Sequence, residues 1–419
     1  MLFVYLYIVA MFVRPQDWVP GLIGLPTAFL IIPAGILVGL ATNGRDFTRN
    51  PLVQNKLMFV YLGVIFISTT YNEGFALGWE QCVEFLKRVM VYFMIVLNVN
   101  TVDKLRRTLT FTLIVCGFIA YQAILQGVTG FSWGGQTPYP GYDEIRVRWY
   151  GDWDGPNVFG LLFVMAAGLA MERIFGREQN LFARLFGIGL MAAFFASIYY
   201  TNSRGAVLSV VVGTAYYFRA KLFKPHIAGI AATLLGGFLA FAPSRMSQVS
   251  SEEESAGQRT WLWEQGMGML RDNPIFGVGR GQFASNTDLK LIAHNNYVQN
   301  FAELGLPGYF VFIALIWFSF IGTWRLARQR YDLPEPLRQS GRALQSMLIG
   351  YAACTFFVVM ELDLLYLVFG LCAAAYLIGQ KDCETLPAMR MTKFHAKMIV
   401  SGMCLIYFAI WLAAIKEIV

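Results

Sequence analysis

The chain is dominated by apolar stretches that are each long enough to cross a membrane as a helix. Of its 419 residues 57% are hydrophobic, and the mean hydropathy is +0.52. About 20 apolar residues span the hydrocarbon core as a helix, which satisfies its own backbone hydrogen bonds there. We therefore predict an all-α, polytopic membrane protein with 12 or 13 spans, at residues 2–13, 22–40, 57–71, 82–98, 105–126, 156–172, 185–201, 205–218, 226–243, 304–324, 343–360, 364–379 and 398–415.

The basic residues predict how these spans are oriented. Loops that stay in the cytoplasm carry an excess of Lys and Arg, and most of the 33 Lys and Arg residues fall in alternate loops. This bias puts the N-terminus inside and two long loops, 127–155 and 244–303, outside. We therefore treat residues 1–419 as one integral membrane domain with a large outer loop at 244–303 and a smaller one at 127–155.

Charge, cysteine and histidine content narrow the classes of function. The formal charge of +7 follows from the loop bias and gives no reason to expect a nucleic acid partner. None of the six cysteines falls in an outer loop, so no disulfide framework is predicted. Of the three histidines, His226 and His395 are expected inside and His294 outside. A metal centre with two or three histidine ligands is therefore not expected.

The loop 244–303 has a predicted order of its own. Residues 258–270 are compatible with a helix, in which Trp261 and Trp263 are expected to anchor the loop at the membrane interface. Asn273-Pro274 should end this helix, because proline cannot continue a helix and restricts the residue before it.

Arg280 follows in a glycine-rich run, Gly277-Val278-Gly279-Arg280-Gly281-Gln282. The glycines predict a turn whose backbone N–H groups can approach an anion, although such a run can also be only a turn. It is not a dinucleotide-binding fingerprint, because the third glycine is out of register and no strand precedes it. We take Arg280 as a candidate ligand of a phosphate group.

Arg204 lies in a short outer turn between two apolar spans. A guanidinium at the membrane surface costs free energy unless it is paired, and the turn offers no acidic neighbour in sequence. The side chain could simply reach out to the interface. Its planar fork could instead donate two hydrogen bonds to phosphate oxygens, so we also take Arg204 as a phosphate ligand.

His294 is the predicted general base. An imidazole with an ordinary pKa near ~6.5 suits proton transfer at neutral pH, although a lone histidine can also fill a buried hydrogen bond. A helix is expected from His294 to Leu304, with Tyr297 and Phe301 on the same face as His294. Glu303 falls on the opposite side of that helix, so it is not expected to orient His294.

Further candidates for substrate contact are less specific. Lys87 and Arg88 lie in a predicted span, where an i,i+4 ion pair between Glu84 and Arg88 is an equal alternative. Asn157 and Asn295 complete the set of candidate substrate-binding residues. For Glu361 and Asp363, in a short outer turn, helix capping is expected.

Three separated motifs together resemble one family. The run Asn202 to Ala206 comes first, the glycine-rich run around Arg280 follows, and His294-Asn295-Asn296-Tyr297 with a later Glu-Leu-Gly comes last. Their order and predicted topology resemble the O-antigen ligase and polymerase superfamily of bacterial envelopes. Gly155-Pro156-Asn157 at the start of a span is similar too, so the resemblance covers about 150 residues from Gly155 to Gly308.

The resemblance implies a fold of the GT-C type in the bacterial inner membrane, with its site on the periplasmic side. It implies transfer of a glycan from undecaprenyl pyrophosphate to an acceptor hydroxyl such as lipid A-core, within the membrane lipid and without cofactor, nucleotide or metal. In that reading His294 deprotonates the acceptor, while Arg204 and Arg280 hold the pyrophosphate.

Other functions stay open at this point. An O-antigen or exopolysaccharide polymerase shares the donor chemistry, and so does a ligase that attaches glycan to protein hydroxyls. A lipid or sugar transporter is the alternative from another class. It would call for paired, broken spans and for ionisable groups near the membrane midplane.

Overall fold

The computed structural model describes residues 1–49, 52–140, 144–219, 254–359 and 363–415, and every regular element in these ranges is a helix. The first half of the chain forms α1 (Leu2–Phe12), α2 (Pro15–Trp18), α3 (Thr27–Arg49), α4 (Val53–Glu73), α5 (Phe75–Asn98), α6 (Val102–Thr129), η1 (Gly151–Trp153), α7 (Pro156–Phe175), α8 (Leu181–Thr201) and α9 (Arg204–Tyr217). The second half forms α13 (Glu254–Asp272), η2 (Ala284–Asn286), α14 (Asn296–Ala327), α15 (Glu335–Cys354), α16 (Asp363–Asp382) and α17 (Lys393–Ile415).

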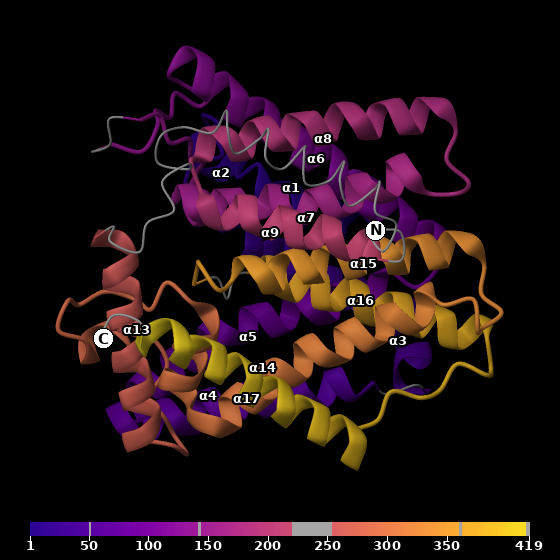
Figure 1. Ribbon diagram of the computed structural model, residues 1–419. Coiled ribbons are helices and arrows are strands. Elements are labelled where there is room, and N and C mark those ends of the chain that lie inside the picture. Colours follow the sequence, from indigo (N-terminus) through magenta and orange to yellow (C-terminus); the bar gives the residue numbers. More distant parts are fainter. Residues whose placement is uncertain (50–51, 141–143, 220–253, 360–362, 416–419) are drawn as a thin grey trace.

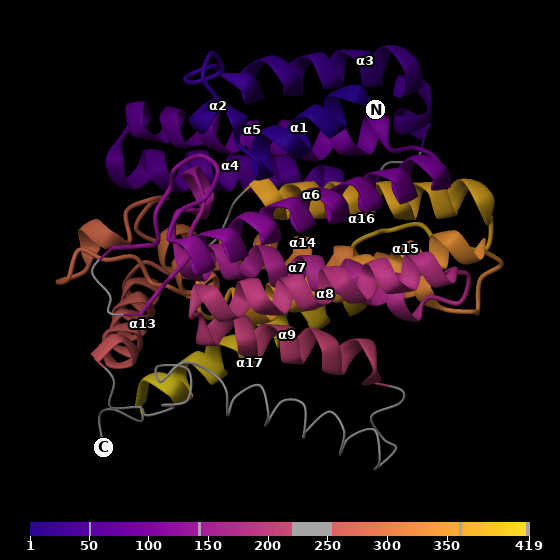
Figure 2. The same cartoon turned by 90° about the horizontal axis from the view of Figure 1, so that it is seen from above.

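The long helices run side by side as a bundle, and α13 lies across one end of it (Figures 1 and 2). We call this end, where α7, α9 and α14 begin, the loop end. The opposite end holds the beginnings of α6 and α15 and the last turn of α7.

Burial separates central helices from peripheral ones. The apolar window of α16 is 89% buried within the protein, whereas the windows in α3 and α17 are each 17% buried. A helix that is apolar yet exposed needs a lipid solvent. The central helices therefore pack on protein, and α3 and α17 present most of their surface outward.

The predicted all-α membrane class is confirmed, and the count of spans is refined. Among the described residues, eight helices are long and apolar enough to cross a membrane: α3, α4, α6, α7, α8, α14, α16 and α17. The expected spans at α1 and α9 exist as helices but are only 11 and 14 residues long. The expected spans 82–98 and 343–360 fall largely in α5 and α15, which are long enough but are not among these eight apolar helices. The expected span 226–243 lies outside the described residues, as does His226.

Candidate functional site

The predicted helix 258–270 lies within α13, which ends at Asp272 directly before Asn273-Pro274, as expected. The turn that follows has positive φ angles of 63°, 93° and 76° at Gly277, Gly279 and Gly281. Such angles strain any residue with a Cβ atom. The three glycines thus let the chain double back around Arg280.

Backbone hydrogen bonds connect this turn to α14 at a point where that helix is interrupted. Gly305 has φ 64° and ψ −167° inside that helix, and Pro307 follows it. The N–H of Gly279 donates to the carbonyl oxygen of Glu303 at 2.9 Å, and the N–H of Leu306 donates to the carbonyl oxygen of Pro274 at 2.8 Å. The break frees backbone groups of α14, and the turn satisfies them.

Side chains of α4 hold the turn from the other side. The Asn72 amide donates to the carbonyl oxygen of Gly277 at 3.1 Å, and the N–H of Arg280 donates to Thr69 Oγ1 at 3.1 Å. Ser68 Oγ also donates to the carbonyl oxygen of Phe276 at 2.5 Å. Three polar residues of one helix therefore position the backbone that carries Arg280.

Arg280 lines a polar cavity of about 340 Å³ at the loop end. Arg280 is 8% exposed, and its guanidinium lies 5.1 Å from the centre of the Phe85 ring. The remaining lining residues come from α5, the turn, α14 and the chain after α15: Gln81, Glu84, Arg88, Gly281, Asn296, Gln299, Asn300, Glu303, Leu304 and Val359. Two arginines and several amide groups thus face one space, a composition suited to a charged, hydroxyl-rich ligand.

Glu303 is a site residue that sequence periodicity did not single out. It is 6% exposed and accepts hydrogen bonds from the Phe283 N–H at 3.2 Å and from the Gln299 amide. Gln299 Oε1 in turn accepts from the Ala293 N–H at 3.0 Å. Glu303 therefore braces the residue next to His294 through Gln299, a link that helix spacing alone does not reveal.

His294 stands outside the helix that was expected to carry it. Its φ of 49° is left-handed, and α14 begins only at Asn296. The expected shared face with Tyr297 and Phe301 was therefore wrong, because the two residues before the helix turn the chain away. Such a φ is uncommon for a residue other than glycine and costs roughly 1–3 kcal/mol where it is held by its surroundings.

The chain on both sides of His294 is pinned. Trp263 Nε1 donates to the carbonyl oxygen of Ala293 at 2.9 Å. Asn295 Oδ1 caps α14 by accepting from the N–H groups of Tyr297 and Val298 at 2.9 and 3.2 Å. Trp263 is 8% exposed, so it braces the loop from within rather than anchoring it at the membrane interface as expected.

The half-buried imidazole of His294 makes no hydrogen bond within the described ranges of the chain. Burial, and secondly the charge of Arg259, lower the pKa of His294 to about 4. Both effects disfavour the cationic form. The ring is therefore neutral at pH 7 and able to accept a proton.

Arg204 is the first residue of α9 and is half-buried. A cation there opposes the helix dipole, which favours anions at a helix N-terminus. Gly205 packs so closely on Phe357 that an added Cβ would lie 2.7 Å from the Phe357 Cβ. The start of α9 therefore abuts the chain that follows α15.

The segment 355–359 links the three predicted residues. Phe357 contacts the start of α9 next to Arg204. The N–H of Asn296, two residues after His294, donates to the carbonyl oxygen of Thr355 at 2.9 Å. Val359 lines the cavity together with Arg280. The segments that carry Arg204, Arg280 and His294 thus meet around residues 355–359. His294 and Arg204 are not among the residues that line the cavity itself.

Lys87 and Arg88, the two neighbouring basic residues of α5, have different partners. Arg88 lines the cavity and has its Nε 3.6 Å from Asp363 Oδ1, so the alternative of an ion pair with Glu84 was wrong. Glu84 pairs instead with Lys87, whose ammonium lies 4.8 Å from the centre of the Phe29 ring. Lys87 does not line the cavity, because its side chain leaves the helix on another side from Arg88.

The other minor candidates have structural partners. Asn157 Oδ1 accepts from Arg146 at 3.3 Å, which ties the loop 127–155 to the start of α7. Asp363 accepts a hydrogen bond from the Tyr7 hydroxyl at 2.7 Å in addition to its pair with Arg88. Glu361 lies outside the described residues.

Together these features define a polytopic membrane protein with an arginine-lined cavity at one end of its helical bundle. Residues 189–313, which contain Arg204, Arg280 and His294, match the family model described as O-antigen ligase. The match confirms the resemblance to the O-antigen ligase superfamily, a family of membrane glycan ligases and polymerases with glycosyl-transfer activity. No curated protein matches the chain.

Proposed function

We propose that the protein transfers a glycan from undecaprenyl pyrophosphate to an acceptor hydroxyl, with lipid A-core as the acceptor. The observation that carries the proposal is the polar cavity with Arg280 and Arg88, set beside segments that bring in Arg204 and His294. In this proposal the protein lies in the bacterial inner membrane, its loop end faces the periplasm, and no metal, nucleotide or other cofactor takes part.

His294 acts as the base in the proposed reaction. Its neutral imidazole takes the proton of the acceptor hydroxyl as that oxygen attacks the anomeric carbon of the glycan. The bond between this carbon and the pyrophosphate oxygen breaks, and the electron pair stays on the pyrophosphate. A direct displacement of this kind inverts the configuration of the anomeric carbon.

Arg280 and Arg204 hold the leaving pyrophosphate. Negative charge grows on the phosphate oxygens as the bond breaks, and guanidinium groups fixed in advance stabilise it without reorganising. Arg280 is held by its backbone bond to Thr69, by Phe85 below its guanidinium and by the glycine turn. Arg88 extends the same cationic lining from α5.

The bound donor also helps the base. A pyrophosphate close to His294 supports the protonated imidazole and raises its pKa above the value of about 4 in the free enzyme. Proton transfer to His294 therefore becomes more favourable once the donor is in place.

Substitution of the base tests the proposal. His294→Gln keeps a polar side chain of similar length and should fold and insert normally. Removing a general base typically costs 10²–10⁴-fold in rate, so we expect at least a hundredfold loss of carrier release. Lys290→Gln, which removes an exposed positive charge four residues earlier, is the matched control and should keep its activity. Normal turnover by His294→Gln would remove the base from the mechanism.

The acceptor separates the ligase from its close alternatives. Purified protein is given the same lipid-linked donor with lipid A-core, with a second lipid-linked repeat, or with a serine-containing peptide. Glycan attached to lipid A-core is the expected product. Chain extension of the lipid-linked repeat would identify a polymerase, and glycosylated peptide would identify a protein ligase.

A further inference from the structure

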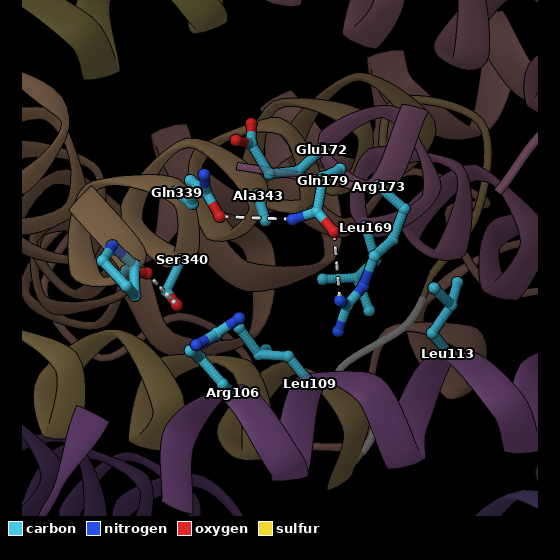
Figure 3. Close-up of a pocket in the computed structure, with 11 residues that line it drawn as sticks. Arg106, Leu109, Leu113, Leu169, Glu172, Arg173, Gln179, Gln339, Ser340 and Ala343 are labelled. Atoms are coloured by element: carbon cyan, nitrogen blue, oxygen red, sulfur yellow. Dashed lines mark hydrogen bonds between the residues drawn. The ribbon is translucent and has the colours of Figure 1, made fainter. Parts of the chain in front are cut away.

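A second polar pocket lies at the opposite end of the bundle, remote from the proposed site. It is formed by the first turns of α6 and α15 and the last turns of α7, and its volume is about 40 Å³ (Figure 3). Its polar lining consists of Arg106, Glu172, Arg173, Gln179, Gln339 and Ser340. Since a water molecule needs roughly 10–15 Å³ measured in this way, the pocket admits a small polar group and not a sugar.

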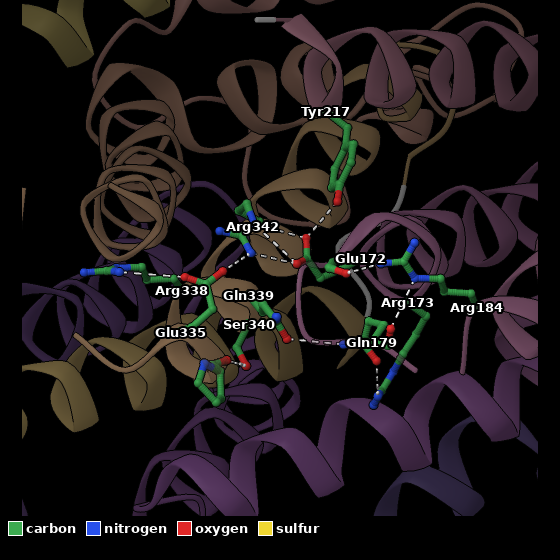
Figure 4. Close-up of polar contacts among 12 residues, drawn as sticks. Glu172, Arg173, Gln179, Arg184, Tyr217, Glu335, Arg338, Gln339, Ser340 and Arg342 are labelled. Carbon is green, nitrogen blue, oxygen red and sulfur yellow. Dashed lines mark hydrogen bonds and ion pairs between the residues drawn. The ribbon is translucent and has the colours of Figure 1, made fainter. Parts of the chain in front are cut away.

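The carboxylate of this pocket is already neutralised. Glu172 accepts from Arg342, whose Nη2 lies 2.9 Å from Oε1 and whose Nε lies 3.2 Å from Oε2. The Tyr217 hydroxyl donates to the same carboxylate at 2.9 Å (Figure 4). Arg342 Nη2 also donates to Glu335 Oε1 at 2.8 Å, and Glu335 pairs in turn with Arg338. The charges of these two arginines and two glutamates therefore cancel. Glu172 therefore forms no ion pair with the two arginines on the other side of the pocket among the described residues, and it offsets the repulsion between them only in part.

Those two arginines have no carboxylate partner among the described residues. Among the residues that the structure describes, the Arg173 guanidinium donates to the Thr110 hydroxyl and to Gln179 Oε1, the latter at 3.5 Å. Arg106 is exposed, and its guanidinium makes no hydrogen bond or ion pair within the described ranges. The positive charge of Arg106 opposes that of Arg173. An anion between them would relieve this repulsion.

The pocket also contains an unused buried donor. Gln339 is 4% exposed, and its Oε1 accepts from the Gln179 amide at 3.2 Å. Within the part of the chain that the structure describes, its own Nε2 has no hydrogen-bond acceptor. A buried donor left unsatisfied is costly, so native structures usually provide a partner for it. An oxygen of a bound anion would supply that partner.

The surroundings indicate which kind of anion fits. Large apolar side chains beside the pocket, at the end of α7 and the start of α8, are strongly exposed: Phe175, Leu181, Phe182 and Leu185. In a protein that spans a membrane these side chains face acyl chains. The pocket therefore lies where a lipid headgroup meets the hydrocarbon, and basic pockets between helices at this depth suit anionic headgroups.

We propose that this pocket binds the phosphate group of an anionic phospholipid from the leaflet at this end of the protein. Arg106 and Arg173 hold the phosphate oxygens, and Gln339 Nε2 donates to one of them. The bound lipid would brace α6, α7 and α15 against one another. The proposal does not depend on the reaction at the loop end.

Lipid titration of the full-length protein in a neutral detergent tests the proposal. The fraction bound is measured by native mass spectrometry with phosphatidylglycerol, with phosphatidylcholine and with inorganic phosphate alone. We expect tighter binding of phosphatidylglycerol than of phosphatidylcholine. Each interfacial arginine contributes about a fivefold change in affinity. The double variant Arg106→Gln/Arg173→Gln should therefore bind phosphatidylglycerol about 25-fold more weakly.

The control variant removes the same charge from neighbouring positions. Arg107→Gln/Arg177→Gln changes two exposed arginines that do not line the pocket, and it should bind the lipid as the unmodified protein does. Gln339→Glu provides a variant with both arginines intact and should also lose the preference for phosphatidylglycerol, because it adds a negative charge to the pocket. Three results would each overturn the proposal. The control variant could weaken lipid binding as much as the double variant does, or the protein could bind both lipids equally well. Inorganic phosphate could also bind as tightly as phosphatidylglycerol.

Discussion

The protonation of His294 offers a quantitative test of the proposed base. Burial and the nearby Arg259 lower its pKa from the ordinary 6.5 to about 4. At about 1.4 kcal/mol per pKa unit, the protein disfavours the imidazolium by roughly 3–4 kcal/mol. Because only the neutral ring accepts a proton, activity should persist well below the pH at which an exposed histidine would be charged.

The expected pH profile follows from these values. With a pKa of about 4, roughly 90% of the enzyme holds a neutral His294 at pH 5, compared with roughly 3% for an ordinary histidine. The pH dependence of kcat/KM reports the pKa values of groups in the free enzyme. The value of kcat/KM should stay nearly flat from pH 7 to pH 5 and fall only as the pH approaches 4.

The fall of kcat/KM at low pH is the acid limb of the profile, and replacing Arg259 should move it in a known direction. Arg259→Gln removes a cation that disfavours imidazolium, so the pKa of His294 should rise and the acid limb should shift to higher pH. Burial is the larger cause, and the limb should therefore stay below pH 6.5. NMR titration of ¹⁵N-labelled histidine, assigned with His294→Gln, measures the same pKa independently. A limb at pH 6.5 in the unmodified enzyme, unmoved in Arg259→Gln, would refute this reasoning.

Three further predictions follow from the site. Arg280→Lys keeps the charge but loses the planar fork, so carrier release should fall more than tenfold; full activity would exclude bidentate binding. Gly277→Ala puts a Cβ 2.4 Å from the Glu303 backbone at a positive φ and should destabilise the protein by about 1–3 kcal/mol in thermal unfolding, whereas Gly268→Ala, in open space on α13, should not. Trp263→Phe removes the indole bond to Ala293 and should lower kcat at temperatures where the variant is still fully folded; unchanged kcat would show that this brace has no part in turnover.

Local features of this site were predictable from the sequence. Apolar length predicted most of the helices, and Asn273-Pro274 predicted the end of α13. The glycines around Arg280 predicted a turn, which the positive φ angles confirm. These features depend on a few neighbouring residues, which is why local rules suffice for them.

Long-range partners were not predictable in the same way. Ser68, Thr69 and Asn72 meet the turn from more than 200 positions earlier in the chain. Arg88 takes Asp363 of α16 as its partner instead of its helical neighbour Glu84. Helical periodicity says which face of a helix is apolar, but not which other helix will cover it.

The break in α14 shows a signal that could have been used. Gly305 and Pro307 lie two residues apart in an apolar helix, where both residues weaken helical structure. Their presence predicts a kink near residue 305. The error over His294 has a different cause, because the expected helix began at His294, whereas Asn295 caps α14 and the helix begins at Asn296.

Release of the lipid carrier tests the central claim most directly. Purified protein in lipid vesicles is incubated with undecaprenyl-pyrophosphate-linked glycan and lipid A-core, without added metal or nucleotide, and free undecaprenyl pyrophosphate is measured. We expect release that depends on the acceptor and is lost in His294→Gln. Movement of the intact donor across the bilayer without release, or equal release by His294→Gln, would contradict the proposed glycan transfer.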